Sequence, residues 1–345
     1  MPLGELPPPN LRKVPLLPSI SILYSTQDTP FGGANQFLKA LDAEFLRQGC
    51  RAATVEAADV ILFNSHHEPE RVLKARRRFP RAIFLHRVDG PMRLYNRPDD
   101  RRDAVVARLN DFAADATVFQ SGWSRDQNRK LGWVQSGPEA VIGNAPDPSV
   151  FHPPAQRRVP GKPVRLIATS WSSHPRKGFD VYDYLDRHLD FERFGMTFIG
   201  NSPVTFSRIR QLPPLPSLEL AEQLREADIF ITGSQSDPCS NSLTEALHCR
   251  LPAIARNDGG HPEILGKGGL LFEDPKEIPA LLERLLEDYD AYVSGIRVPS
   301  IEEIAKRYID FAQSLIEMRG QGNLRPKRPG LLSAWRLGRR LAADG

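Results

Sequence analysis

Ser234–Glu263 reads SQSDPCSNSLTEALHCRLPAIARNDGGHPE, and this stretch carries the pattern on which the fold class rests. It follows one apolar run, opens a helical pattern after small polar residues, passes through a second apolar run and ends in a Gly-Gly turn. Such an order of strand, helix and strand is typical of a βαβ unit with two parallel strands. The stretch therefore predicts an α/β fold with a mostly parallel sheet.

The same alternation of apolar runs and helical segments extends through both halves of the chain. Strands are predicted at Ser19–Tyr24, Asp59–Phe63, Arg81–Leu85, Ala116–Gln120, Ala140–Ile142, Val164–Thr169, Met196–Gly200, Asp228–Thr232, Leu251–Ala255 and Gly269–Phe272. Helices are predicted at Gly33–Gln48, Asp180–His188, Ser217–Ala227, Ser242–Cys249, Pro275–Tyr289 and Ile301–Glu317. We expect two doubly wound, Rossmann-like sheets, with the carboxyl ends of their strands facing a common central cleft.

A proline-rich segment, Gly143–Pro163, separates the two halves. Proline cannot donate to a strand ladder, so this segment is interpreted as a linker between domains. A chain of 345 residues is also longer than single cores usually reach. The predicted division is a Pro-rich segment 1–18, an N-terminal Rossmann-like domain 19–150, a linker 151–163, a C-terminal Rossmann-like domain 164–295, a helix 300–318 and a basic tail 319–345.

Composition and charge exclude several classes of protein. The net charge is +4, but acidic and basic residues are interleaved, without the basic and aromatic stripe of a nucleic-acid-binding surface. Three cysteines, and the lack of a signal-peptide or membrane-spanning apolar run, indicate a cytoplasmic protein. The sequence contains neither a zinc-type spacing of Cys and His nor a GxxxxGK[ST] loop, so no metal and no cofactor is expected.

The tail Leu331–Gly345, LLSAWRLGRRLAADG, has a pattern of its own. Leu331, Trp335 and Leu341 fall near one face of a helix with arginines elsewhere, which suits peripheral contact with an anionic membrane. Glycines in and before the tail favour disorder instead, and both interpretations stay open.

The polar residues after the strand at Asp228–Thr232 form the richest candidate site. A helix that begins after a small polar loop offers free N–H groups and the positive end of a dipole, which suits a phosphate. Glu245 has two interpretations, either a carboxylate that faces a ligand or the partner of Ser242 in an S-x-x-E capping box. Asp237, just before Pro238, fits either a turn or a ligand contact.

A second cluster is SWSSHPRKG (Ser170–Gly178), directly after a predicted strand. Arg176 and Lys177 would place positive charge where a diphosphate leaving group needs it. Loop cations are also commonly just solvated, so the second interpretation is a surface loop.

Two further motifs follow predicted strands. Gly32 and Gly33 in TPFGGA let the backbone approach a ligand closely, or simply precede a helix. His86 and Asp89 in HRVDGP stand at the predicted end of the third strand. A lone histidine there is more often packed or capping than catalytic, whereas a His and Asp together in a cleft would indicate a site.

Taken in order, these motifs resemble family four of the retaining GT-B glycosyltransferases. Segments similar to that family are GGA before a long helix, ADATVFQSGWSRDQNRKLG (Ala114–Gly132), VIGNAPDPSVFHP (Val141–Pro153), VRLIATSWSSHPRKG and SDPCSNSLTEALHCRLPAIARNDGGHPEIL. The resemblance extends from Ile20 to Leu286. It implies the GT-B fold, with two Rossmann-like domains that face a central cleft.

The resemblance also implies roles for individual residues. Asp237 and Glu245 occupy the positions of two acids that bind the donor, the first at the transferred sugar and the second at the ribose hydroxyls. Lys177 matches a phosphate-binding lysine, and His86 matches a histidine near the reacting carbon. We place Asp89 on the acceptor side. Further donor contacts are implied at Gly32, Gly33, Cys239, Ser240, Asn241, Ser242 and Leu243.

Two positions depart from the family pattern. Asp237 stands where the family has glutamate and is one methylene shorter. Ser172 holds the place of an arginine that commonly precedes the lysine, and Arg176 is the candidate replacement for its charge.

The implied activity is metal-independent transfer of a sugar from a nucleotide-sugar donor to an unidentified acceptor, with retention of anomeric configuration. One alternative is a catalytically lapsed protein of the same fold that binds nucleotide-sugars or regulates other proteins. Another is a nucleotide-sugar epimerase or a phosphorylase on the same architecture.

Overall fold

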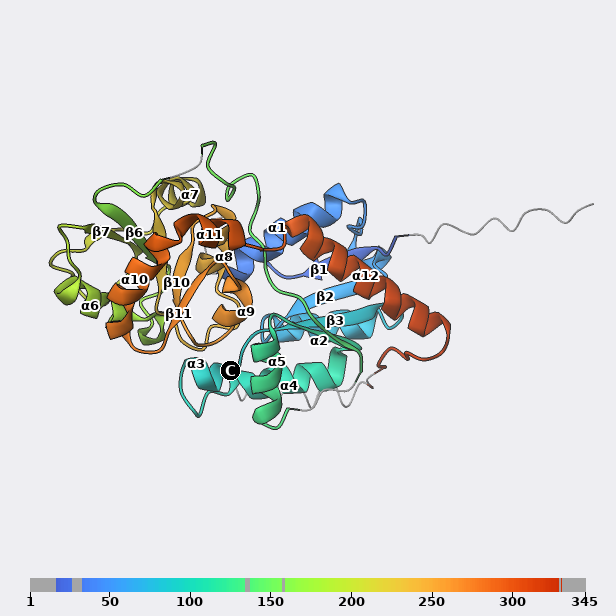
Figure 1. The fold of residues 1–345 in the computed structure, drawn as a ribbon. Helices are drawn as coiled ribbons and strands as arrows, with labels where there is room; N and C mark the ends of the chain where they lie inside the picture. Colours follow the sequence, from blue (N-terminus) through green and yellow to red (C-terminus); the bar gives the residue numbers. More distant parts are fainter. Residues whose placement is uncertain (1–16, 27–32, 134–136, 157–158, 329, 331–345) are drawn as a thin grey trace, which may run out of the picture.

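The computed structural model describes residues 17–26, 33–133, 137–156, 159–328 and 330, which form two sheet domains side by side (Figure 1). Within these residues the N-terminal sheet has five parallel strands in the order β1-β2-β3-β4-β5, and the C-terminal sheet has six parallel strands in the order β11-β10-β9-β6-β7-β8. The strands are β1 (Ile20–Leu23), β2 (Val60–Asn64), β3 (Ile83–Val88), β4 (Ala116–Phe119), β5 (Glu139–Val141), β6 (Val164–Ser170), β7 (Phe194–Gly200), β8 (Arg210–Leu212), β9 (Ile229–Thr232), β10 (Ala253–Arg256) and β11 (Gly269–Phe272).

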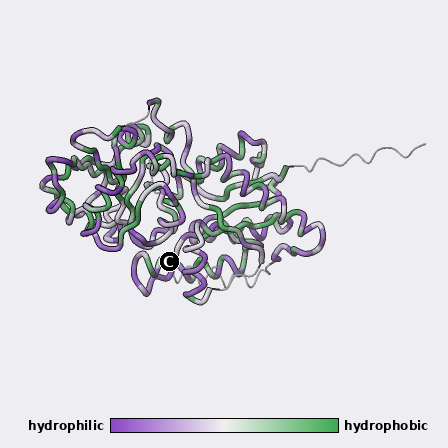
Figure 2. The backbone as a smooth tube through the Cα atoms, in the orientation of Figure 1, coloured by the Kyte–Doolittle hydropathy of each residue, from purple (hydrophilic) through white to green (hydrophobic). Residues whose placement is uncertain are grey.

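Helices cover both faces of each sheet (Figure 1). They are α1 (Gly33–Arg47), α2 (Pro69–Arg78), α3 (Met92–Tyr95), α4 (Arg102–Ala113), α5 (Gly122–Lys130), α6 (Phe179–His188), α7 (Ser217–Glu226), α8 (Asn241–His248), α9 (His261–Leu265), α10 (Ile278–Glu287), α11 (Tyr289–Gly295) and α12 (Ile301–Gly320). Figure 2 shows the central strands as largely hydrophobic and the outer helices as mixed. Burial on both faces explains why the strands are continuous apolar runs instead of alternating ones.

Both sheets are doubly wound, as expected. In the C-terminal sheet, β7 lies on one side of β6 and β9 lies on the other. In the N-terminal sheet, β1 pairs with β2 on one side. On its other side, Ile20 of β1 forms an isolated parallel bridge with Arg51. The winding therefore changes direction at β1 and β6, and ligands of α/β proteins bind beside such switch points.

The last helix, α12, returns to the N-terminal domain. Ile304, Tyr308 and Leu315 of α12 are buried in one core with helix α1. The ring of Tyr308 packs edge-on against that of Phe45, with 6.4 Å between their centroids. The N-terminal domain is thus built from two separate parts of the chain.

The third strand differs from its prediction in a way that matters for the site. β3 continues to Val88 instead of ending at Leu85, because Arg87 and Val88 pair in register with β4. His86 therefore lies inside the strand, and Asp89 is the first residue after it.

Candidate functional site

A cavity of about 420 Å³ lies where the carboxyl ends of the two sheets face each other. It is lined by the end of β3, the turn after β6 and the loop between β9 and α8, among other segments of both domains. Its charged lining residues are Arg87, Asp89, Lys177, Asp237 and Glu245. All of these except Arg87 were predicted from the sequence.

Lys177 and Asp237 form an ion pair in the cavity. The Nζ atom of Lys177 lies 3.0 Å from Oδ2 of Asp237 and 5.6 Å from the centre of the Tyr95 ring. Burial lowers the pKa of Lys177, but the carboxylate of Asp237 outweighs burial and holds that pKa above its ordinary value. Burial also acts to raise the pKa of Asp237, and Lys177 reverses this and holds it below its ordinary value. Both groups are therefore charged near neutral pH.

Two glycines shape the loops that carry this pair. Gly259 has a φ of +63°, and a Cβ atom there would come within 2.3 Å of the carbonyl oxygen of Asp237. The next amide, that of Gly260, donates a hydrogen bond of 2.9 Å to the same oxygen. Gly178, with a φ of +82°, would collide in the same way with Gly233, at 2.3 Å. Only glycine fits either position, because both backbone conformation and space exclude a side chain.

Glu245 projects from α8 and lines the cavity without an ion pair or side-chain hydrogen bond to any described residue. Burial raises the pKa of its carboxyl group to about 8. The capping-box interpretation is wrong, because Ser240 is the N-cap and accepts a hydrogen bond of 3.4 Å from the amide of Leu243. Ser242 lies inside the helix. Glu245 is only partly buried in the cavity, and hydroxyl groups of a ligand could donate hydrogen bonds to its carboxyl oxygens.

The amino end of α8 borders the cavity. Of the predicted donor contacts in this loop, Cys239, Asn241 and Ser242 line the cavity, whereas Ser240 and Leu243 are buried behind it. The amides of Asn241 and Ser242 form no hydrogen bond with a described residue. Such free N–H groups at a helix start, with the dipole behind them, suit an anionic ligand.

Arg87 was missed by the sequence analysis. It is fully buried at the end of β3, where Nη1 donates to Oδ1 of Asn64 at 2.6 Å. Nη2 donates to Oδ1 of Asn144 at 2.7 Å, and the guanidinium group lies 4.8 Å from the centre of the Phe37 ring. A signal was available in the sequence, since an arginine within an apolar strand is costly to bury unless it is paired.

Asp89 faces the cavity beside this arginine. Its Oδ1 atom accepts hydrogen bonds from Nη1 of Arg87, at 3.2 Å, and from Nε2 of Gln120. Its Oδ2 atom forms no hydrogen bond with a described residue, so it remains available to a ligand hydroxyl. Nearby, Nδ2 of Asn144 donates to Oδ1 of Asn241 at 2.9 Å, which links this side of the cavity to α8.

The structure does not bring His86 to the cavity. Its side chain is fully buried, with Nε2 at 3.0 Å from the carbonyl oxygen of Ser65 and the ring stacked on Phe63. Burial lowers the pKa of His86 to about 3, so the ring is uncharged. The expectation that this histidine faces the cleft is wrong, because β3 extends past it and Asp89 takes the position after the strand.

Arg176 also lies outside the cavity lining. Its Nη1 atom donates to Oε1 of Gln235 at 3.2 Å. Ser172, which stands where the family has an arginine, does line the cavity. Within the described residues the second cation of the cavity is therefore Arg87, from the other domain, and the expectation that Arg176 fills this place is wrong.

The glycine motif after β1 is described only in part. Gly32 lies outside the described residues, whereas Gly33 begins α1. Ala34 and Gln36, in the first turn of that helix, line the cavity. The start of α1 thus borders the cavity, whereas donor contacts by Gly32 and Gly33 themselves stay a prediction.

Contacts between the two domains flank the cavity. The carboxylate of Glu263 accepts hydrogen bonds from the amides of Gly122 and Trp123, at 2.8 and 2.7 Å. On the other side, the ring of Tyr95 stacks on that of His174, with 4.3 Å between centroids. These contacts join α9 to α5 and the turn after β6 to α3.

Comparison with known proteins finds similarity to glycosyltransferases over part of the chain. Residues 203–288, which include Asp237 and Glu245, match the family model described as Glycosyl transferases group 1. The chain is similar to this family over that part of its C-terminal domain. A probable sucrose-phosphate synthase from Thermosipho melanesiensis is 23% identical over 170 residues, which cover 46% of this chain and 40% of that protein. The match thus spans less than half the length of that relative.

Solved structures share the GT-B fold of this chain. Sucrose-phosphate synthase from Thermosynechococcus elongatus is 18% identical, with a TM-score of 0.55 over 90% of this chain and 78% of that chain. HepE from Anabaena, in complex with UDP-glucose, is 13% identical, with a TM-score of 0.59 over 95% of this chain and 100% of that chain. At these identities the likeness concerns the fold alone.

Proposed function

We propose that this protein transfers a sugar from a nucleotide-sugar donor to an acceptor hydroxyl, with retention of anomeric configuration. The observation that carries the proposal is the meeting, in one cavity, of Lys177, the amino end of α8 and the unpartnered carboxyl group of Glu245. A nucleotide-sugar presents the matching groups, since it carries a diphosphate between a ribose diol and a sugar. The match of residues 203–288 to the family model of group 1 glycosyl transferases supports the same activity.

The donor diphosphate would lie at the amino end of α8, against the amides of Asn241 and Ser242. Lys177 would stabilise the negative charge that gathers on the diphosphate as the glycosidic bond breaks. Glu245 would accept hydrogen bonds from the ribose hydroxyls, and Asp237 would contact the transferred sugar. Because a lysine and a helix dipole meet the diphosphate charge, we expect activity without a divalent metal.

In the transfer step, the bond between the anomeric carbon and the diphosphate oxygen breaks, and its electron pair leaves on the diphosphate. The acceptor oxygen forms the new bond to the anomeric carbon, and its proton passes to the departing diphosphate oxygen. The free Oδ2 atom of Asp89 would orient the acceptor hydroxyl. Arg87 holds Asp89 in place and adds positive potential to the cavity.

Thermal stabilisation by a panel of nucleotide-sugars tests the donor site, because a ligand that binds only the folded state raises its stability by mass action. UDP-glucose, which the Anabaena structure contains, is the first donor to include. Release of nucleoside diphosphate on addition of candidate acceptors then tests transfer. A protein that no nucleotide-sugar stabilises would contradict the proposal.

A nucleotide-sugar-binding protein without transferase activity is the second candidate. Ser172 favours it, since this position supplies a hydroxyl group where the family commonly has a cation. Stabilisation by a donor, without release of nucleoside diphosphate by any acceptor, would support this candidate.

A further inference from the structure

A second pocket, of about 1100 Å³, lies at the amino ends of the strands of the N-terminal sheet, whereas the cavity described above lies at their carboxyl ends. Its lining includes Ala58 and Asp59, which precede β2, and Arg81 and Ala82, which precede β3. These strands are parallel, so their amino ends lie across the sheet from Asp89. The pocket is therefore separate from the proposed donor site.

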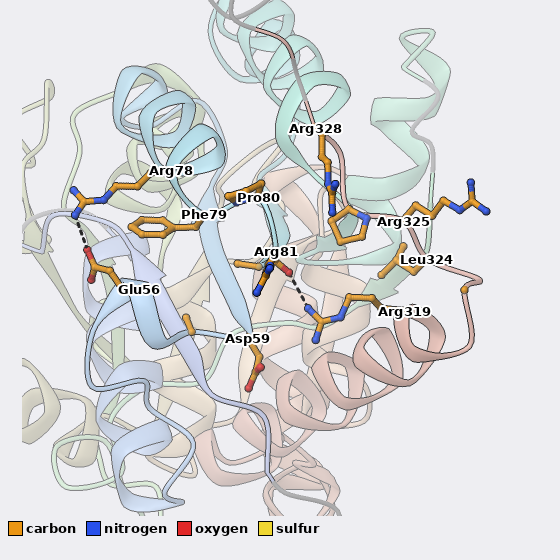
Figure 3. A pocket seen from close by; sticks show the side chains of 14 residues that line it. Glu56, Asp59, Arg78, Phe79, Pro80, Arg81, Arg319, Leu324, Arg325 and Arg328 are labelled. Carbon is orange, nitrogen blue, oxygen red and sulfur yellow. Dashed lines mark hydrogen bonds and ion pairs between the residues drawn. The ribbon is translucent and has the colours of Figure 1, made fainter.

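Arginines dominate this pocket. Five of them line it, and Figure 3 shows Arg78 on one side beside Glu56, Arg325 on the opposite side, and Arg81, Arg319 and Arg328 between them. A neighbouring pocket of about 650 Å³ shares Arg78 and Arg328 and adds Lys74 and Arg77. We refer to these seven residues as the arginine surface.

Two acidic residues line the larger pocket and offset little of this charge. Glu56 lies 3.5 Å from Arg78, in a pair of exposed side chains. Asp59 accepts hydrogen bonds from the amide and hydroxyl of Ser19, at 3.1 and 2.7 Å. The other arginines of the pocket form no ion pair with a described residue, and Nη1 of Arg319 donates a hydrogen bond of 2.8 Å to the carbonyl oxygen of Arg81. Guanidinium groups without a carboxylate partner can bind phosphate through two parallel hydrogen bonds.

We propose that the arginine surface binds the phosphate headgroups of an anionic membrane. The chain passes beyond the described residues next to this surface, since Gly330 lines the smaller pocket. It continues as LLSAWRLGRRLAADG, which combines leucines and a tryptophan with further arginines. That composition is typical of segments that lie in a membrane interface, so a lipid surface matches both the pocket and the sequence that follows it.

None of the helices in the described ranges combines the length and apolar character that a membrane span requires. Attraction of this kind depends on exposed charges and is screened by salt. It goes beyond the proposed transferase function and does not depend on it.

The test is flotation of the full-length chain with vesicles of phosphatidylcholine alone, or with about one-third phosphatidylglycerol. Wild type should bind only the anionic vesicles, and more weakly as salt rises. Combined Arg81→Glu, Arg325→Glu and Arg328→Glu should weaken binding by roughly 100-fold or more, since each basic residue near such a surface contributes about fivefold. Thermal unfolding and donor stabilisation of this variant should match wild type, because all three side chains are exposed and far from the cavity.

A matched control reverses three exposed cations of the C-terminal domain, Arg210→Glu, Lys267→Glu and Lys276→Glu, and gives the same net charge. This control should still bind the anionic vesicles. An equal loss of binding in the control would overturn the proposal, because it would show that binding depends on the net charge of the protein and not on the arginine surface. A chain that ends at Gly330 separates the surface from the tail. If binding is lost in that chain but survives the triple reversal, the tail alone holds the membrane and the proposal fails. Preference for single-stranded RNA over anionic vesicles, abolished by the triple reversal, would overturn it as well.

Discussion

Lys177 is the residue on which the proposed chemistry depends most. As the glycosidic bond breaks, charge develops on the diphosphate, so a cation beside it acts more strongly in the transition state than in the ground state. Lys177→Ala should lower kcat by roughly 100- to 1000-fold, with a smaller effect on donor affinity. Steady-state kinetics and donor titration separate the two effects.

Arg176→Ala and Arg129→Ala are the controls for that variant. Arg176 bonds to Gln235 outside the cavity, and Arg129 forms a surface ion pair of 2.7 Å with Glu139. Both substitutions should leave kcat close to wild type. Near-normal turnover of Lys177→Ala would rule out the leaving-group assignment and shift weight to the binding-protein candidate.

Glu245 makes stability depend on pH in a specific direction. Burial raises the pKa of its carboxyl group from 4.5 to about 8 in the folded state. Between these values the folded protein holds a proton that the unfolded chain has lost. The free energy of unfolding should therefore fall as pH rises from 4.5 to about 8, by at most about 1.4 kcal/mol per pH unit, and level off above that range.

Glu245→Gln should remove this contribution. Denaturant unfolding across the pH range measures it, as the difference in unfolding free energy between wild type and variant. If ribose hydroxyls bind the ionised carboxylate, wild-type donor affinity should also rise with pH up to about 8 and stay flat in the variant. At that pH the variant should bind donor about 1.5–3 kcal/mol more weakly. Equal donor affinity in both proteins would remove Glu245 from the donor site.

At the scale of elements, helix α5 is capped partly by the other domain. Its N-cap, Ser121, accepts a hydrogen bond from the amide of Ser124. The carboxylate of Glu263 in α9 accepts hydrogen bonds from the amides of Gly122 and Trp123. Helix starts leave such amides without partners inside the helix, so a carboxylate there stabilises both the helix and the contact between domains.

Glu263→Ala should lower the free energy of unfolding by about 1 kcal/mol, the usual cost of a lost helix cap. Chemical denaturation measures the change. Glu283→Ala is a suitable control, since Glu283 forms an exposed ion pair with Arg193 at 2.7 Å. Exposed pairs contribute little, so equal losses in both variants would contradict a capping role for Glu263.

At the scale of the whole molecule, the C-terminal segment completes the N-terminal domain. Arg76 and Asp115 form an ion pair of 2.9 Å whose side chains are both fully buried. The carbonyl oxygen of Lys327 accepts a hydrogen bond of 2.8 Å from Nε of Arg76, and its amide donates one of 2.7 Å to Asp115. The segment after α12 thus satisfies both members of a buried pair.

Asp115→Ala should lower the free energy of unfolding by about 3–5 kcal/mol, because it leaves a buried arginine without its partner. A chain that ends at Gly322 should lose about 3–6 kcal/mol, since it loses two hydrogen bonds to charged groups and each contributes about 1.5–3 kcal/mol. A chain that ends at Gly330 retains Lys327 and should unfold like wild type. Asp183→Ala, which breaks an exposed pair with Arg187, is the control and should cost less than about 1 kcal/mol.

The sequence by itself determined the fold class and the charged residues that the C-terminal domain contributes to the cavity. Strands buried on both faces are continuous apolar runs, which can be recognised without knowing their neighbours. Lys177, Asp237 and Glu245 follow such strands closely, and the carboxyl ends of parallel strands meet at one edge of a sheet. Their convergence therefore follows from local sequence and the topology that it implies.

Only the tertiary structure decided which residues of the first domain reach the cavity. Pairing with β4 carries β3 to Val88, which buries His86 and places Arg87 and Asp89 at the edge of the sheet. The return of α12 and the gathering of the arginine surface likewise join segments far apart in the chain. Strand pairing and burial are properties of several segments together. A local sequence pattern therefore cannot predict where a strand ends or which segment packs beside it.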